Sequence, residues 1–221
     1  KTVAVPTVIL SGLFLYILQS HDKIGKNRQP SLNLTRDTMR LLFEMDKRDY
    51  ESCTHSFVRN SARSIIISGN RIAMIHSMKY DYYKFPGGGI ENGEDPITAM
   101  VRETREEAGL VVRPETVKEY GYVHRIQKSD MDASECFIQD NYYYLCQVND
   151  EAVSPCLDQY EADENYVLEY VEPEIAIRKN RSVSQSPHNP MMLAREAKVI
   201  ELLLSEGFLE NPYQKHPEQT P

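Results

Sequence analysis

Three glutamates near the middle of the chain stand at helical spacing. Glu103, Glu106 and Glu107 occupy positions i, i+3 and i+4, so on a helix their carboxylates share one face. Neighbouring anions repel one another unless cations balance them, and Mg²⁺ and Mn²⁺ prefer carboxylate and water oxygens. The spacing therefore favours a divalent-metal site that would hold a diphosphate and activate water.

The same helix face also fits a plainer interpretation. Arg102 and Arg105 lie among the glutamates, and such a charged face is usually a solvated, ion-paired surface. The preceding segment, 85–89, counts against this, because its glycines let the backbone approach a ligand closely. Glu94 adds a carboxylate beside the helix start. We assign substrate binding to Gly87, Gly88, Gly89 and Glu94.

Local signals define the helix that carries these carboxylates. Asp95 is an N-cap residue, Pro96 suits the first helical position, and Gly109 ends the helix about three turns later. The opposite face is expected to pack on a sheet and to leave the acidic face in a cleft. The residues expected to pack are Ile97, Val101, Thr104 and Ala108.

The flanking sequence predicts strands and one late helix. Two β-rich runs, 64–68 and 72–76, are separated by Gly69-Asn70-Arg71, which indicates a hairpin. An apolar pattern at 191–205 predicts an amphipathic helix that Gly207 would stop. Four further runs predict strands: 110–112, 117–126, 137–148 and 166–171.

The glycine loop and the acidic helix together resemble the Nudix hydrolase family. Its box reads G-x5-E-x7-R-E-U-x-E-E-x-G-U, where U is a bulky apolar residue. The positions that match are Gly88, Glu94, Arg102, Glu103, Glu106, Glu107, Gly109 and Leu110. Only Thr104, at the first U, is less apolar than the pattern.

The resemblance implies an α/β fold, the Nudix α/β/α sandwich with a mixed sheet. To this fold we add an N-terminal extension and a C-terminal helix. We divide the chain into an apolar segment with a polar linker at 1–38, a Nudix hydrolase domain at 39–180, and a C-terminal helix with a loose tail at 181–221.

The resemblance also implies a role for each box residue. Glu103, Glu106 and Glu107 are expected to bind metal, Mg²⁺ or alternatively Mn²⁺, and Glu103 or a neighbouring glutamate to take a proton from the attacking water. Arg102 is expected to hold the glutamates by ion pairing and Glu94 to support them. Gly88 and Gly109 are expected to supply backbone geometry.

Family members often add an acid from a later loop, shortly before a strand that leads into a helix. The segment 166–174 resembles that junction. We select Glu164 as a fourth metal ligand. Glu161, Asp163 and Glu169 compete for the role, as does the interpretation of Glu164 as an unrelated surface acid.

The implied activity is metal-dependent hydrolysis of a diphosphate linkage in a nucleoside diphosphate derivative or a nucleoside triphosphate. The box does not specify the nucleobase or the leaving group. A Nudix domain that senses a nucleotide without cutting it is the alternative, although a sensor has no need of a water-activating set of glutamates.

Composition restricts the partners. A net charge of −8 argues against a nucleic-acid polymer, because such binding needs many Lys and Arg on phosphates. We expect a small nucleotide-like diphosphate as substrate.

The four cysteines lack zinc-finger spacing, which predicts reduced thiols and a cytoplasmic location. The C-terminal helix either caps the core or builds a homodimer, and the sequence leaves both open.

The segment 3–18 is almost wholly apolar and precedes basic residues. As a helix it reaches only about 24 Å, short of a ~30 Å hydrocarbon core. Three interpretations stay open: a membrane tether, a packed helix or strand, and a segment outside the functional protein with Met39 as an alternative start.

Overall fold

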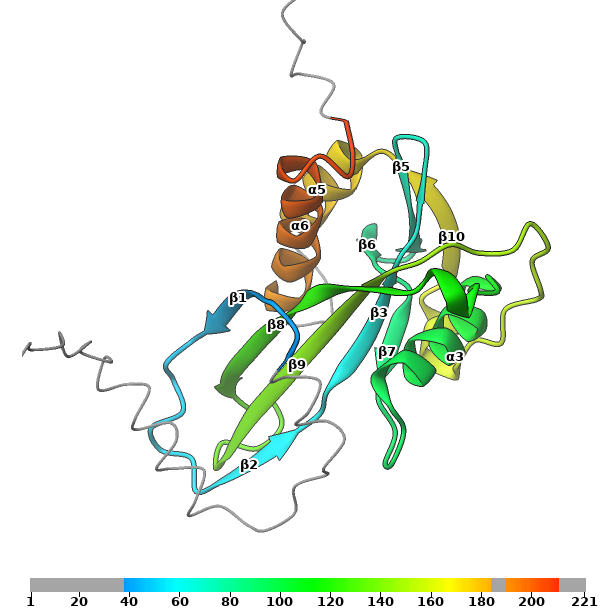
Figure 1. The fold of residues 1–221 in the computed structure, drawn as a ribbon. Coiled ribbons are helices and arrows are strands. Elements are labelled where there is room, and N and C mark those ends of the chain that lie inside the picture. The colour runs from blue at the N-terminus through cyan, green and yellow to red at the C-terminus, as the bar shows by residue number, and fades with distance from the viewer. Residues whose placement is uncertain (1–37, 184–189, 211–221) are drawn as a thin grey trace, which may run out of the picture.

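A computed structural model describes residues 38–183 and 190–210 (Figure 1). The apolar segment 3–18 lies outside these residues, so the predictions about it stay predictions. Within the described ranges, no helix is both long and apolar enough to cross a lipid bilayer.

The larger sheet has six strands and mixed direction. Its order is β1-β8-β9-β3-β7, with β2 also paired to β9. The β8–β9 and β3–β7 pairs are antiparallel, whereas β1 runs parallel to β8 and both β2 and β3 run parallel to β9. The predicted mixed sheet is confirmed. The strands are β1 (Leu41–Asp46), β2 (His55–Val58), β3 (Ser61–Ile65), β7 (Gly87–Gly89), β8 (Lys118–Lys128) and β9 (Glu135–Leu145).

A second sheet, which the sequence did not predict separately, has four antiparallel strands. They are β4 (Ile67–Ser68), β5 (Arg71–Ser77), β6 (Tyr82–Lys84) and β10 (Tyr166–Val171). The predicted hairpin is confirmed as β4–β5, but the single strand predicted at 64–68 was wrong. The chain passes from one sheet to the other there. The Ile65 carbonyl accepts from Cys146 N, which directly follows β9 of the larger sheet, and the Ile66 carbonyl accepts from Ala73 N in β5 of the second sheet.

The helices lie on two sides of the larger sheet (Figure 1), with α5 packed against α6. The predicted C-terminal helix is confirmed as α6, and the predicted domain boundary at 180 falls inside α5. The α-helices are α3 (Pro96–Ala108), α4 (Gln159–Asp163), α5 (Pro173–Ser182) and α6 (Pro190–Ser205), and a 3-10 helix spans Pro114–Thr116.

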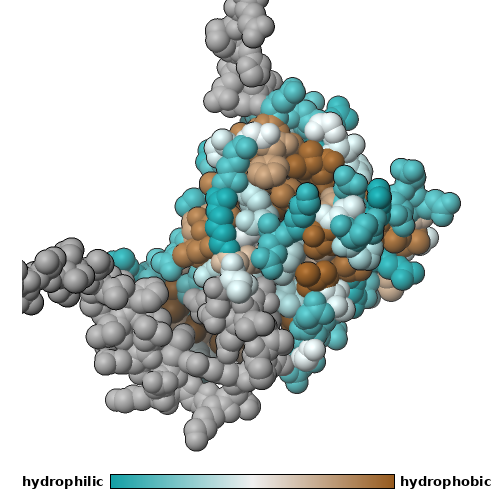
Figure 2. Space-filling view, in the orientation of Figure 1, coloured by the Kyte–Doolittle hydropathy of each residue, from teal (hydrophilic) through white to brown (hydrophobic). Residues whose placement is uncertain are grey.

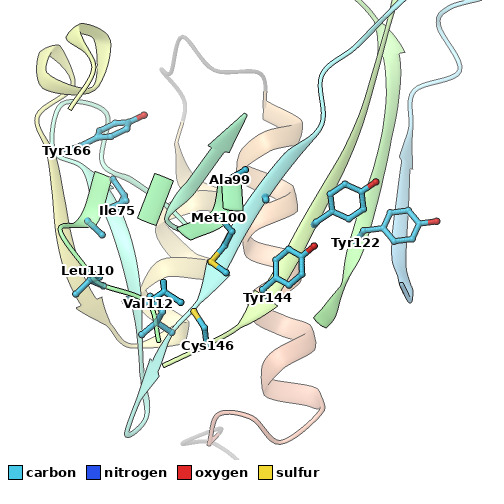
Figure 3. Packing of buried hydrophobic residues seen from close by; sticks show 14 of the residues in the cluster. Ile75, Ala99, Met100, Leu110, Val112, Tyr122, Tyr144, Cys146 and Tyr166 are labelled. Carbon is cyan, nitrogen blue, oxygen red and sulfur yellow. The ribbon is translucent and has the colours of Figure 1, made fainter. Parts of the chain in front are cut away.

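Alternating side chains of β9 pack on the two helical layers. Tyr142 and Tyr144 belong to the buried cluster that includes Met100 of α3 (Figure 3). Tyr143, between them, belongs to the cluster that includes Ile200 of α6. Because successive side chains of a strand point to opposite faces, α3 and α6 cover opposite faces of the sheet. This confirms the predicted α/β/α architecture.

The surface over these layers is mixed. On the face shown in Figure 2, hydrophobic areas are interrupted by hydrophilic residues and do not form one continuous apolar region. A surface with both kinds of residue is normal for a folded protein.

Candidate active site

The helix α3 begins and ends at the predicted residues. Asp95 caps it, because its Oδ1 accepts hydrogen bonds from Ile97 N at 3.0 Å and Thr98 N at 3.1 Å. Pro96 is the first helical residue, and Gly109 ends the helix in the left-handed conformation at φ 65. These caps satisfy backbone groups that the helix ends would otherwise leave unpaired.

The packed face of α3 differs from the predicted one. Ile97 is 41% exposed, so its predicted packing on a sheet was wrong. Ala99 and Met100 are fully buried in its place, and α3 packs against β3 and β7. Glu107 also lies on the buried face. The prediction of one shared acidic face opposite the core was therefore wrong for Glu107.

Arg102 joins the carboxylates of the outer face. Its Nε and Nη2 donate to the two oxygens of Glu94 at 3.0 and 2.9 Å. Its Nη1 donates to Glu103 Oε1 at 2.8 Å and to Glu106 Oε2 at 3.1 Å. The hydrogen bonds from Arg102 lower the pKa of the Glu94 carboxyl. One guanidinium thus holds three carboxylates close to the glycine loop, where Nη2 also donates to Gly89 O at 3.2 Å.

Glu107 has a different environment, fully buried against a lysine. Its Oε1 lies 2.5 Å from Lys84 Nζ, and its Oε2 accepts from Gly87 N at 3.0 Å. Burial raises the pKa of Glu107 to about 7, although the Lys84 ammonium opposes this shift. Lys84 is itself only 6% exposed and lies over the Tyr166 ring at 4.8 Å.

Sequence reasoning missed Lys84. Lysine is among the residues least often buried, so nothing in its type marked it as a partner of Glu107. Its place at the end of β6, three residues before Gly87, was the one available signal.

Glu103 lies between these two environments, against the backbone of the loop. Burial raises the pKa of the Glu103 carboxyl, and the contact with Arg102 opposes the shift. A Cβ on Gly88 would overlap this carboxylate. Gly88 therefore lets the backbone pass directly beside Glu103, because glycine has no Cβ. Glu106 is the most open of the three, with 44% of its side chain exposed.

Glu164 is buried with hydroxyl partners. Its Oε2 accepts from Tyr82 OH at 2.7 Å and from Ser77 Oγ at 3.0 Å. Glu161, one of its competitors, caps α4 by accepting from Asp158 N at 2.9 Å. The charge of Glu161 contributes to raising the pKa of Glu107. Which acid serves as the later ligand stays a prediction.

The donor set suits a hard divalent cation, because all candidate ligand atoms are carboxylate oxygens. In the described ranges, however, no three His, Cys, Asp or Glu side chains are arranged as a closed metal site. Protein cations occupy the carboxylates instead: Lys84 contacts Glu107, and Arg102 contacts one oxygen each of Glu103 and Glu106. The chemistry of these ligands fits the metal.

A groove of about 670 Å³ runs along the outer side of α3. Arg102, Arg105 and Glu106 line it from the helix, and Val153 and Cys156 line it from the segment before α4. Two members of the Arg102 cluster, Arg102 and Glu106, therefore border this groove.

The comparisons with known proteins agree with the box. A model of the NUDIX domain matches residues 58–189, more than half of the chain. The U8 snoRNA-decapping enzyme of Homalodisca vitripennis is 37% identical over 68 residues, 30% of this chain and 36% of that protein. An RNA pyrophosphohydrolase of Psychromonas ingrahamii is 33% identical over 99 residues, 39% of this chain and 54% of that protein. The chain thus spans about a third to about half of these relatives.

Solved structures also resemble the chain. A NUDIX hydrolase from Nitrosomonas europaea aligns over 65% of this chain and 90% of that one, with a TM-score of 0.46 and 15% identity. A NUDIX-family hydrolase from Clostridium perfringens covers 65% and 97%, with a TM-score of 0.39 and 16% identity. On the extent of the domain match, and with the box residues on and beside α3, this chain belongs to the Nudix family, whose members generally use divalent metal ions.

Proposed function

We propose that this chain hydrolyses a diphosphate linkage in a nucleoside diphosphate derivative or a nucleoside triphosphate, with Mg²⁺ as the preferred ion and Mn²⁺ as a substitute. The observation that carries the proposal is the Arg102 cluster, in which one guanidinium contacts Glu94, Glu103 and Glu106 beside the glycine loop. Such a cluster offers a concentrated set of oxygen ligands at the edge of a groove.

The chain's own residues divide the work as follows. Glu103, Glu106 and Glu107 would hold the metal, which when bound supplies charge stabilisation and a more acidic water. Glu103 is the residue we assign to receive a proton from that water, because its carboxylate lies against Gly88 and burial raises its pKa above the ordinary value. The groove along α3 would accept the remainder of the substrate.

The names of two relatives suggest a specific form of this substrate. Both names refer to RNA: one relative is a U8 snoRNA-decapping enzyme and the other is an RNA pyrophosphohydrolase. The net charge of −8 argues against long contact with an RNA backbone. A terminal nucleotide with its phosphates still presents the linkage that the site requires, so a short 5′-triphosphorylated RNA belongs among the substrates tested.

A nucleotide sensor is the second candidate, and one observation favours it. Lys84 neutralises Glu107 inside the protein, so this carboxylate has a partner even without metal. A sensor would bind a nucleotide through the groove without cutting it.

The experiment is a panel of nucleoside triphosphates, nucleotide sugars, ADP-ribose, dinucleoside polyphosphates and 5′-triphosphorylated RNA, incubated with Mg²⁺. Product release is compared among the wild type, Glu103→Gln and Glu115→Gln. Glu115 is a matched control, because its side chain is 65% exposed and pairs with Arg113, two residues earlier in the chain. Turnover that Glu103→Gln loses and Glu115→Gln keeps supports the hydrolase. Binding without turnover would support the sensor.

A further inference from the structure

The helix α6 carries two adjacent charged residues that are completely buried. Arg195 is 1% exposed and Glu196 is 0% exposed. Charged side chains are almost never fully buried unless they are paired, because removing them from water is costly. The contacts of Arg195 and Glu196 therefore show which parts of the protein this buried pair holds together.

Glu196 connects α6 to the segment that leads into the glycine loop. Its Oε1 accepts from Arg195 Nε at 3.0 Å and from Arg195 Nη2 at 2.6 Å. Its Oε2 accepts from the backbone N of Phe85 at 3.0 Å. The two oxygens of one carboxylate thus bind a helix side chain and a loop amide 111 residues earlier in the chain.

Arg63, on β3, holds the same segment from its carbonyl side. Its Nη1 donates to Phe85 O and to Gly87 O, each at 3.1 Å. Its Nε lies 3.7 Å from Glu196 Oε1, so the two residues also form an ion pair. Phe85 is therefore held at its amide by Glu196 and at its carbonyl by Arg63.

The 85–87 backbone and the next residue directly contact the candidate catalytic carboxylates. The N–H of Gly87, whose carbonyl Arg63 holds, donates to Glu107 Oε2 at 3.0 Å. The next residue, Gly88, lies against the Glu103 carboxylate. A shift of the 85–87 backbone would thus move the surroundings of both Glu103 and Glu107.

We propose that Glu196 and Arg63 are positioning residues for the hydrolysis, which hold the backbone of 85–87 so that α6 fixes the path of the chain into β7, beside the candidate catalytic carboxylates. This inference rests on the proposed function for its effect on turnover. Its structural part, that α6 orders the loop, stands independently of that function.

The charge state of the network supports this role. Burial alone would raise the pKa of the Glu196 carboxyl, but the guanidinium groups of Arg195 and Arg63 hold that pKa below its ordinary value. An ionised carboxylate is a stronger acceptor than a neutral one. The Phe85 amide is accordingly held by a charge-assisted hydrogen bond at a fixed point of α6.

A second ion pair on α6 provides a matched control. Glu201, further along the same helix, pairs with Arg181 of α5 at the surface. It belongs to the same helix and loses the same charge in a Glu→Gln substitution, but it pairs with Arg181 of α5 rather than with the 85–87 backbone. Any effect common to both variants reflects helix docking rather than loop positioning.

The test compares the wild type, Glu196→Gln and Glu201→Gln by kcat, by KM and by amide hydrogen exchange. For Glu196→Gln we expect kcat to fall about 10- to 100-fold with a smaller change in KM, because small displacements of a catalytic group have effects of this size. Exchange at Phe85 and Gly87 should accelerate about tenfold while the amides of α3 are unchanged. Glu201→Gln should stay within about twofold of the wild type on each measure.

A second variant guards against failure to fold. In Arg63→Met/Arg195→Met/Glu196→Leu all three charges are replaced by apolar side chains, a change that proteins often tolerate without loss of stability. We expect cooperative unfolding to persist while turnover stays low and exchange at Phe85 stays fast.

Three outcomes decide the matter. Activity of Glu196→Gln equal to that of Glu201→Gln would overturn the positioning role, as would unchanged exchange at Phe85. An inactive wild type would remove the proposed function, but the exchange rates would still decide whether α6 orders the loop.

Discussion

Glu106 and Glu107 are neighbours in the chain, yet they lie in opposite kinds of environment. The Glu106 side chain is 44% exposed and shares Arg102 with two other carboxylates. The Glu107 side chain is 1% exposed and has Lys84 as its ion-pair partner. Coulomb interactions strengthen as water is excluded. Substitutions on the outer side of α3 should therefore cost little free energy of unfolding, whereas substitutions on the inner side should cost much more.

The largest effect should follow from removing the inner cation. Lys84→Met would leave the Glu107 carboxylate buried without its partner, and breaking such a pair costs about 3–5 kcal/mol. We expect urea denaturation to show a loss of this size in the free energy of unfolding. Lys84→Met/Glu107→Leu, which removes both charges, should recover most of it. A loss below about 1 kcal/mol in the single variant would show that the inner pair is already hydrated.

Gly88→Ala should affect activity more than stability. The new Cβ would overlap the Glu103 carboxylate, so this side chain must move away from the loop. We expect turnover to fall about 10- to 100-fold, measured as kcat on the best substrate of the panel. Gly89→Ala provides the comparison, because its Cβ would meet Arg59 Nε at an ordinary 3.5 Å. Equal losses in the two variants would refute the specific contact with Glu103.

The cap of α3 should contribute less. Asp95→Ala removes the acceptor for Ile97 N and Thr98 N, and the loss of an N-cap side chain typically costs about 1 kcal/mol. Thermal and urea unfolding should report this loss. Asp95→Asn, which keeps an acceptor oxygen, should retain most of the stability. If the two variants lost the same amount, charge rather than capping would explain the effect.

The smallest effect on stability should come from the outer glutamate. Glu106→Gln removes an exposed i,i+4 ion pair with Arg102, and such pairs contribute about 0.5 kcal/mol or less. The same substitution at Glu107 should cost several times more, because Lys84 would lose its buried partner. Similar losses of unfolding free energy at the two positions would break the contrast between the sides of α3.

Local sequence signals predicted α3 well. The cap at Asp95, the start at Pro96 and the end at Gly109 all agree with the structure, because each depends on a few adjacent residues. The strand β10 and the helix α6 likewise begin within one residue of the predicted positions.

Contacts between distant segments could not be predicted in this way. The pairing of Lys84 with Glu107 joins β6 to α3, and Glu196 reaches Phe85 from the far end of the chain. Both involve charged residues in the interior, whereas hydropathy patterns place charges at the surface. The exposure of Ile97 has a similar origin, since the tertiary packing of Ala99 and Met100 decides which face of α3 is buried.

The most direct test of the account is a metal titration of turnover. The wild type is freed of divalent ions with EDTA, Mg²⁺ is restored stepwise, and product release from the best substrate is compared with that of Glu103→Gln and Glu115→Gln. We predict no turnover without metal, full recovery with Mg²⁺ in the wild type and Glu115→Gln, and no recovery in Glu103→Gln. Metal-independent turnover, or full recovery in Glu103→Gln, would contradict the assignment of these carboxylates to a metal-dependent hydrolase site.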